Sequence, residues 1–163
     1  MTYRLVEVNN QHRQPVIEIF NYYVLNSMVA YADQPVEEDY YVRFLEAAKD
    51  YPAVVIVDQA DRVTGFAFLH HYRPEDTFRR AAVITYFMHP DHTGKGLGTR
   101  VLKRLIEDAK AQNIETLLAN ISSGNELSLQ FHRKHGFREC GRFIRIGRKF
   151  GKDFDVVWVQ LDL

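Results

Sequence analysis

The feature that most constrains the fold of this chain is a run of three segments between residues 81 and 112: an apolar stretch, a glycine cluster and an amphipathic stretch. Residues 81–89 are apolar at nearly every position, which is typical of a central strand covered on both faces. Residues 97–112 carry apolar side chains at helical spacing, which predicts a helix with one face packed inward. A buried strand followed by such a helix indicates an α/β domain.

The remaining periodicities predict strands and helices along the whole chain. Strand patterns occupy residues 3–8, 53–57, 63–72, 116–121, 138–146 and 154–161, and the second and third of these form a hairpin. Helical patterns occupy residues 11–25, 37–49, 97–112 and 125–135. The length of 163 residues suits one compact domain. We therefore expect a single α/β (α+β) domain over residues 1–163, with about four helices flanking a mixed sheet.

Charge and cysteine content exclude several classes of protein. The chain has 21 Lys and Arg residues against 21 Asp and Glu residues, so its net charge favours neither nucleic acid nor an anionic membrane as partner. The N-terminus lacks an apolar signal core, and no stretch approaches the ~20 apolar residues that span a bilayer, so neither secretion nor membrane insertion is expected. The single cysteine, Cys140, excludes an intramolecular disulfide, fits a cytoplasmic protein, and is expected in the core rather than as a nucleophile.

The glycine cluster predicts a phosphate-binding loop. Gly94, Gly96 and Gly98 let main-chain N–H groups approach a ligand, and the N-terminus of the following helix adds partial positive charge. The spacing differs from two known phosphate loops, because Gly96 rather than Ser or Thr follows Lys95, and Thr99 stands where a dinucleotide loop has its third glycine. The loop is therefore interpreted as a pyrophosphate cradle, with a tight turn that binds no ligand as the alternative.

Residues beyond the glycine loop extend the pattern to one that resembles a known protein family. The G-x-G-x-G loop between a buried strand and a helix, followed by Asn125, a further helix and Gly136-Phe137, resembles the GNAT superfamily of acetyltransferases. Residues 17–24, 30–36 and 147–151 resemble its phosphinothricin acetyltransferase branch. The resemblance spans residues 6–161. It implies an acetyl-CoA-dependent N-acetyltransferase that forms a homodimer. It also implies a sheet that is splayed open between the strand that ends near residue 89 and the strand over residues 116–121.

The resemblance also implies where acetyl-CoA binds. The pantetheine arm would enter the splayed sheet and pair with the main chain of Phe87, Met88 and His89. Asn125 would help to hold it. The pyrophosphate would bind to the segment formed by Thr93, Gly94, Lys95, Gly96, Leu97 and Gly98. The superfamily usually has Gln or Arg where this chain has Thr93, so a side chain that would face the phosphates is shorter here. Because main-chain donors supply most of the cradle, we expect weaker binding of acetyl-CoA rather than none.

Acetyl transfer to an amine requires a neutral nucleophile, a donor for the developing oxyanion and a proton source for the departing thiolate. By resemblance, the main-chain N–H of Met88 is the oxyanion donor, and His132, seven residues after Asn125, is the acid. An imidazole with the ordinary pKa of about 6.5 is partly protonated near neutral pH. The alternative for His132 is a histidine packed on a helix face. The branch has a glutamate where this chain has Val83, so no base is assigned. A water chain could take the proton, or the amine could arrive already neutral, and His70, His71 and Tyr86 are lesser candidates.

The acceptor site is predicted from two loops. Tyr31 and Asp33 lie where the resemblance has an acceptor-site loop, and Arg73, with Arg79 and Arg80, offers guanidinium groups that pair with a substrate carboxylate. The branch implies a small amino-acid-like amine as acceptor, such as phosphinothricin or methionine sulfoximine or sulfone. Two alternatives remain open: an acyl-CoA-binding module or sensor with little turnover, and a protein N-acetyltransferase.

Two further patterns have simpler interpretations. His132 and His135 lie three residues apart, yet no nearby Asp, Glu or Cys completes a ligand set, so no metal is expected. A basic stretch alternates with apolar residues near the C-terminus and could contact RNA or an acidic substrate. A solvated strand face or a dimer contact is favoured instead, and no nucleic acid is expected as partner. The basic residues of this stretch are Arg142, Arg145, Arg148, Lys149 and Lys152.

Overall fold

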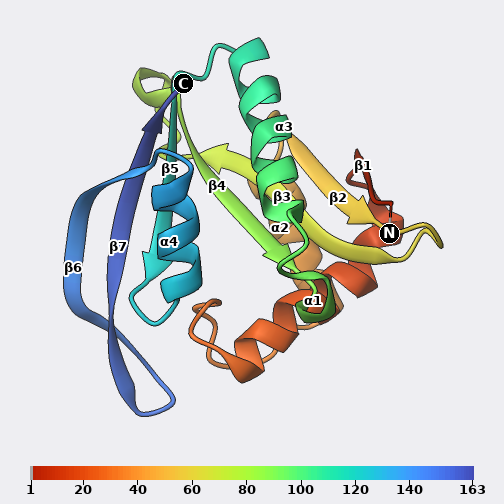
Figure 1. The fold of residues 1–163 in the computed structure, drawn as a ribbon, viewed down its shortest axis with the longest axis horizontal. Helices are drawn as coiled ribbons and strands as arrows, with labels where there is room; N and C mark the ends of the chain where they lie inside the picture. The colour runs from red at the N-terminus through yellow and green to blue at the C-terminus, as the bar shows by residue number, and fades with distance from the viewer. Residues whose placement is uncertain (1) are drawn as a thin grey trace.

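The computed structural model describes residues 2–163 and contains one seven-stranded mixed sheet in the order β1-β2-β3-β4-β5-β7-β6 (Figure 1). The strands are β1 Arg4–Glu7, β2 Ala53–Val57, β3 Val63–His71, β4 Ala81–Met88, β5 Thr116–Ser122, β6 Arg138–Lys149 and β7 Lys152–Asp162. The helices are α1 Arg13–Asn26, α2 Tyr41–Ala47, α3 Leu97–Ala111 and α4 Glu126–Lys134. Short 3-10 turns precede or join them: η1 Asn10–His12, η2 Glu38–Tyr40, η3 Asp76–Phe78 and η4 Pro90–His92.

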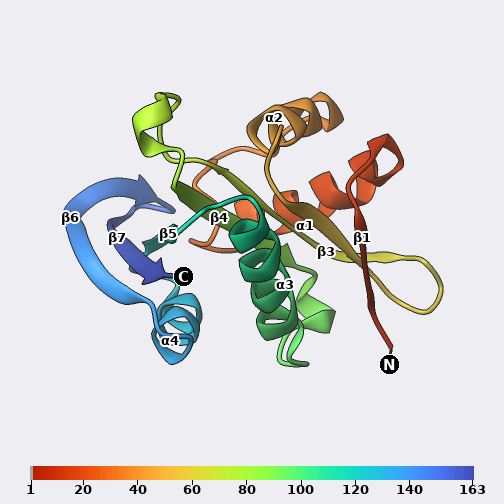
Figure 2. The same cartoon turned by 90° about the horizontal axis from the view of Figure 1, so that it is seen from above.

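Helices cover both faces of the sheet (Figure 2). α1 and α2 lie on one face, where their apolar side chains pack with β2 and β3 in one core cluster. α3 and α4 lie on the other face, where α3 buries Val101, Leu102 and Leu105 in a second cluster with β4 and β5. The predicted mixed sheet with four flanking helices is confirmed. No helix within residues 2–163 combines the length and the apolar character that a membrane crossing requires.

The sheet is open in its middle. β4 and β5 are parallel, but they pair only over residues 81–83 and 116–118. Beyond these three pairs β4 continues along β3, whereas β5 continues along β7 as far as Ser122 (Figure 1). The two strands therefore diverge toward the carboxyl end of β4, which is followed by the glycine loop and α3.

Two turns fix the ends of the helices beside this opening. Gly96 begins α3 with a φ of 76°, a left-handed conformation that glycine adopts without a steric penalty. Asn125 caps α4, and its side-chain oxygen accepts a hydrogen bond from the Ser128 N–H at 3.2 Å. Gly136, with a φ of 89°, follows the end of α4.

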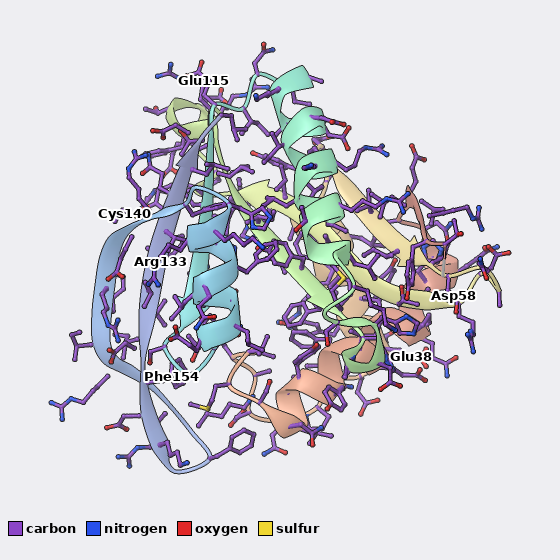
Figure 3. All side chains as sticks on the ribbon, viewed as in Figure 1. Glu38, Asp58, Glu115, Arg133, Cys140 and Phe154 are labelled. Carbon is purple, nitrogen blue, oxygen red and sulfur yellow. The ribbon has the colours of Figure 1, made fainter. Side chains whose placement is uncertain are left out.

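The prediction that Cys140 belongs to the core is wrong. Cys140 lies on β6, the edge strand, whose side chains are nearly all exposed (Figure 3). Its thiol is exposed and donates a hydrogen bond to the Trp158 carbonyl at 3.3 Å. β6 pairs with β7 alone at the edge of the sheet, and its residues are exposed at nearly every position.

Candidate functional site

A cleft of about 400 Å³ lies where β4 and β5 diverge. Along β4, alternate side chains point to opposite faces of the sheet. Thr85 and Phe87 point toward α1 and α2, whereas Tyr86 points toward α3 and α4, and all three line the cleft. The wall also includes Tyr31 and, from the other face, His132. The cleft therefore joins the two faces of the sheet, so that two reactants can meet from opposite sides.

On the α4 side, Tyr86 and His132 form a hydrogen-bonded pair. The distance from the Tyr86 hydroxyl to His132 Nε2 is 2.5 Å, and the two rings stack at 5.6 Å. His132 Nδ1 lies 2.7 Å from the Ser128 carbonyl, which only accepts hydrogen bonds. Nδ1 therefore carries the proton, and Nε2 accepts from the Tyr86 hydroxyl.

This environment keeps both groups uncharged. His132 is only 2% exposed, and burial lowers its pKa to about 4. Burial also raises the pKa of Tyr86, which keeps the phenol protonated. An imidazole with the ordinary pKa would be partly protonated near neutral pH, as expected from the sequence, but the buried His132 ring is neutral at pH 7. The proton that lies nearest to the cleft belongs to Tyr86.

The strand register decides which main-chain groups face the opening. His89 N–H donates to the Thr64 carbonyl at 2.8 Å, and Met88 lies opposite Gly65 on β3. Hydrogen-bonded and non-hydrogen-bonded pairs alternate in an antiparallel ladder, so Met88 N–H points away from β3. The Met88 carbonyl accepts a hydrogen bond from the Tyr23 hydroxyl at 2.5 Å.

The same alternation also decides how the main chain of Phe87 and His89 is oriented. Phe87 lies opposite Phe66 in a hydrogen-bonded pair, so that the main-chain groups of Phe87 and His89 face β3 rather than the opening. Of the three residues expected to pair with the arm, only Met88 presents its N–H to the gap. The main-chain N–H of Tyr86, two residues earlier in the strand, also faces the gap.

The glycine loop is built as an open cradle. Gly94 and Gly96 have φ values of 71° and 76°, and a Cβ at either position would meet no atom within 4 Å. The first N–H groups of α3 have no partner within the helix, so they are available to an anion at this exposed end. Lys95 is exposed and Leu97 is buried, so Leu97 offers only its main chain. The Thr93 hydroxyl donates to the Pro90 carbonyl at 2.9 Å and is therefore used within the loop.

The acceptor side of the cleft differs from the prediction. Arg73 does not reach it: its guanidinium pairs with Glu75 at 3.1 Å on an exposed loop. Arg43, on α2, lines the cleft instead, and its guanidinium lies 5.0 Å from the centre of the Tyr40 ring. Within residues 2–163, no Asp, Glu or Lys lines the cleft, and no carboxylate pairs with Arg43. Arg43 is thus the one permanently charged side chain in the wall.

Sequence reasoning missed Arg43 and undervalued Tyr86. Arg43 reads as an ordinary solvent-facing residue of an amphipathic helix, and only the packing of α2 over the sheet brings it to the cleft. Tyr86 was visible as the one phenol in the apolar strand that precedes the glycine loop, beside Thr85. That signal could have paired it with His132.

The acceptor-side loop is held by the β6–β7 hairpin. Tyr31 stacks on Phe154 of β7 at 5.8 Å, and the buried Lys149 donates to the Ala30 carbonyl at 2.8 Å. Phe154 in turn fills the space above Gly147 on β6, where a Cβ would overlap the ring. The position of Tyr31 at the cleft therefore depends on a glycine in the neighbouring hairpin.

Gly147→Ala is expected to lower the free energy of unfolding by about 1–3 kcal/mol, because the added methyl group displaces the Phe154 ring. The displaced ring shifts Tyr31, so KM for the acceptor rises as well. Gly141→Ala, in the same strand, is the matched control, since a Cβ there meets no atom within 4 Å. Urea denaturation of both variants checks the effect, and equal stability of the two would contradict it.

Both the sequence and the fold match known proteins. The model of the acetyltransferase (GNAT) family matches residues 16–137. The L-amino acid N-acyltransferase MnaT from Escherichia coli is 35% identical over 150 residues, which are 91% of this chain and 87% of that protein. An L-methionine sulfoximine/L-methionine sulfone acetyltransferase from Pseudomonas aeruginosa is 34% identical over 150 residues, also 91% of this chain and 87% of that protein.

A solved structure agrees with these relatives. The crystal structure of a phosphinothricin acetyltransferase (Pat) from Sinorhizobium meliloti in complex with AcCoA superposes with a TM-score of 0.93. The two chains are 27% identical, and the match covers 100% of this chain and 89% of that chain. The family model covers most of the chain, and two relatives are more than 30% identical over 91% of it. This chain therefore belongs to the GNAT family of acetyltransferases.

Proposed function

We propose that this protein is an acetyl-CoA-dependent N-acetyltransferase that acetylates the amine of a small amino-acid-like acceptor. The observation that carries the proposal is the cleft through the open sheet, with a phosphate cradle beside one mouth and one arginine in the other half. The relatives named for L-amino acids and for methionine sulfoximine support the same acceptor class.

The α3 side of the opening fits acetyl-CoA. The main chain from Thr93 to Gly98 would bind the pyrophosphate, because glycines at positive φ leave the N–H groups of the loop and helix uncovered. The Met88 N–H would hold the thioester oxygen, and Asn125, which lines the cleft, would contact the arm. Acetyl-CoA supplies the activated acetyl group.

His132 acts through Tyr86 in this proposal. The Tyr86 hydroxyl is the donor for the departing sulfur, and His132, fixed by the Ser128 carbonyl, positions that hydroxyl. A neutral imidazole suits this positioning role better than the role of acid that the sequence suggested. The Tyr86 pKa stays high, so the proton is present throughout the physiological range.

Arg43 binds the acceptor carboxylate in this proposal. The wall around it is aromatic, with Phe44, Phe68 and Phe87, and among the described residues no acidic side chain lines it to hold a cationic acceptor. A guanidinium pairs with a carboxylate in a bidentate way, which fixes the acceptor's orientation. Amino acids are therefore favoured over polyamines.

Arg43→Gln is expected to lower kcat/KM for amino-acid acceptors about tenfold, because a charge-assisted hydrogen bond at a partly exposed site contributes about 1.5 kcal/mol. The Kd of acetyl-CoA should not change, since Arg43 lies on the opposite side of the sheet. The assay is thiol release with a panel of amino acids, methionine sulfone, phosphinothricin and polyamines.

Arg73→Gln provides the comparison that separates the two arginines. Arg73 is paired with Glu75 outside the cleft, so its replacement should change kcat/KM less than twofold. If kcat/KM fell tenfold in Arg73→Gln and did not change in Arg43→Gln, Arg73 rather than Arg43 would bind the acceptor carboxylate. Tight binding of acetyl-CoA without thiol release in the presence of any amine would overturn the proposal of an enzyme and favour an acyl-CoA sensor.

We also propose a cytoplasmic homodimer. β6 exposes Phe143, Ile144 and Ile146 along one edge of the sheet, at 55%, 65% and 62% of their full area. Such a row of apolar side chains on an edge strand favours contact with a second copy. The lone thiol of Cys140 fits a reducing compartment. Light scattering of the purified protein measures the mass, and a monomer of 19.1 kDa at micromolar concentration would overturn the dimer.

A further inference from the structure

His70 lies at the inner end of the acceptor half of the cleft. It is on β3, next to the central strand, opposite Val83 of β4. Residues that face each other in an antiparallel pair share one face of the sheet, so His70 lies on the α1 and α2 face with Thr85 and Phe87. Its ring lines the cleft and packs 5.9 Å from the ring of Phe68.

The contacts of His70 fix its tautomer. Nδ1 lies 3.0 Å from the main-chain carbonyl of His71, which only accepts hydrogen bonds. Nδ1 therefore carries the proton, and the lone pair is on Nε2. This differs from His132, whose Nε2 already accepts from Tyr86.

His70 is neutral at physiological pH. Burial lowers its pKa below the ordinary 6.5, the His71 carbonyl opposes this by a smaller amount, and the His71 side chain adds to the lowering. The other titratable or charged side chains that line the cleft are Tyr31, Tyr40, Arg43, Tyr86 and His132. None of them is a carboxylate, so within residues 2–163 no acidic side chain of the wall stabilises an imidazolium before the acceptor binds.

An amino-acid acceptor arrives as an ammonium ion and must lose a proton before its nitrogen can attack. Within residues 2–163, the cleft contains no carboxylate that could take this proton. We propose that Nε2 of His70 is the general base that removes the proton from the acceptor ammonium. This inference rests on the proposed function and adds the base that the sequence did not supply.

The step balances as follows. Nε2 takes one proton from the ammonium, which leaves a neutral amine and an imidazolium. The amine nitrogen then forms the C–N bond to the acetyl carbon, the C–S bond breaks, and its electron pair leaves with sulfur. The nitrogen loses its second proton to water while Tyr86 gives its hydroxyl proton to sulfur, and Tyr86 then regains a proton from water, so the products are an amide and a thiol. His70 returns its proton to water.

The test compares the pH dependence of kcat/KM in the native enzyme and in His70→Gln. In the native enzyme, kcat/KM should rise with pH as His70 loses its proton, which happens below pH 6.5 because its pKa is lowered. Above that pH, kcat/KM should stay flat until the acceptor ammonium itself titrates. Without the base, only acceptor that is already neutral reacts. The rate of the variant should then rise tenfold per pH unit up to the acceptor's own amine pKa.

We expect His70→Gln to lower kcat/KM about 100-fold at pH 7, within the usual range for removing a general base, and this deficit to shrink steadily toward pH 9. His70→Glu supplies a carboxylate at the same position, so it should recover at least tenfold over His70→Gln at pH 7. A merely structural role would lower the rate by the same factor at every pH and would give no recovery with glutamate.

A measurement without turnover completes the test. NMR titration of the ring nitrogens of labelled protein should give a pKa below 6.5 for His70 and a proton on Nδ1 in the neutral form. A native enzyme that releases no thiol with any amine overturns the proposed function. A native enzyme that is active while the ratio of native to His70→Gln rates stays constant from pH 6.5 to 9 overturns this inference alone.

Discussion

Tyr86→Phe is expected to lower kcat about 100-fold and to change KM for acetyl-CoA less than threefold. The substitution keeps the aromatic ring, which stacks on His132 and meets Phe131 edge to face, and removes only the hydroxyl. One preorganised donor aimed at charge that develops in the transition state is worth about 100-fold or more in rate. Because the interaction forms only as sulfur becomes negative, the loss belongs to kcat rather than to binding.

The same variant should also be less stable. Removal of the hydroxyl leaves His132 Nε2 as a buried acceptor without a donor, which costs about 1–3 kcal/mol. Stability and rate must therefore be measured separately, by urea denaturation and by stopped-flow recording of thiol release at 25 °C. An unchanged kcat together with the lower stability would leave Tyr86 as a structural partner of His132 only.

The double variant Tyr86→Phe/His132→Phe tests whether His132 acts through Tyr86. If His132 only positions the hydroxyl, its replacement adds no further loss once the hydroxyl is gone, so the double variant should match Tyr86→Phe within about twofold. Additive losses would instead mean that the imidazole contacts the reacting groups directly.

The parts of the fold that the sequence predicted well are those with a strong period. The apolar run over residues 81–89 and the amphipathic run over 97–112 became β4 and α3 within one residue at their ends. In both segments the pattern of apolar residues records which faces are buried, since β4 is covered on both faces and α3 on one. β6 lacked such a signal: its exposure follows from its place at the sheet's edge, which depends on strand order and not on its own residues.

The chemical site was harder to predict than the fold, for two physical reasons. The first is that pKa values depend on three-dimensional burial: His132 has an ordinary imidazole in the sequence, but burial lowers its pKa to about 4. The second is that cleft walls combine distant segments. Arg43 and Arg73 look alike in the sequence, and only the fold places one in the cleft and pairs the other with Glu75.

Gly96→Val is expected to raise the Kd of acetyl-CoA about 30-fold. Gly96 begins α3 at a φ of 76°, a conformation that costs about 1–2 kcal/mol for an ordinary residue and more for a β-branched one. The variant loop escapes this strain by rotating its peptide units, which turns N–H groups away from the pyrophosphate. A loss of about 2 kcal/mol in binding corresponds to the 30-fold change.

Gly96→Asn separates backbone strain from bulk. Asparagine tolerates the left-handed conformation better than valine, and a Cβ at this position meets no atom within 4 Å, so the protein itself has room for either side chain. If the backbone conformation makes the cradle, isothermal titration should give Gly96→Asn a Kd within about fivefold of the native value. Equal losses in the two variants would mean that any side chain at this position blocks the phosphates. A native Kd in both would place the pyrophosphate elsewhere on the protein.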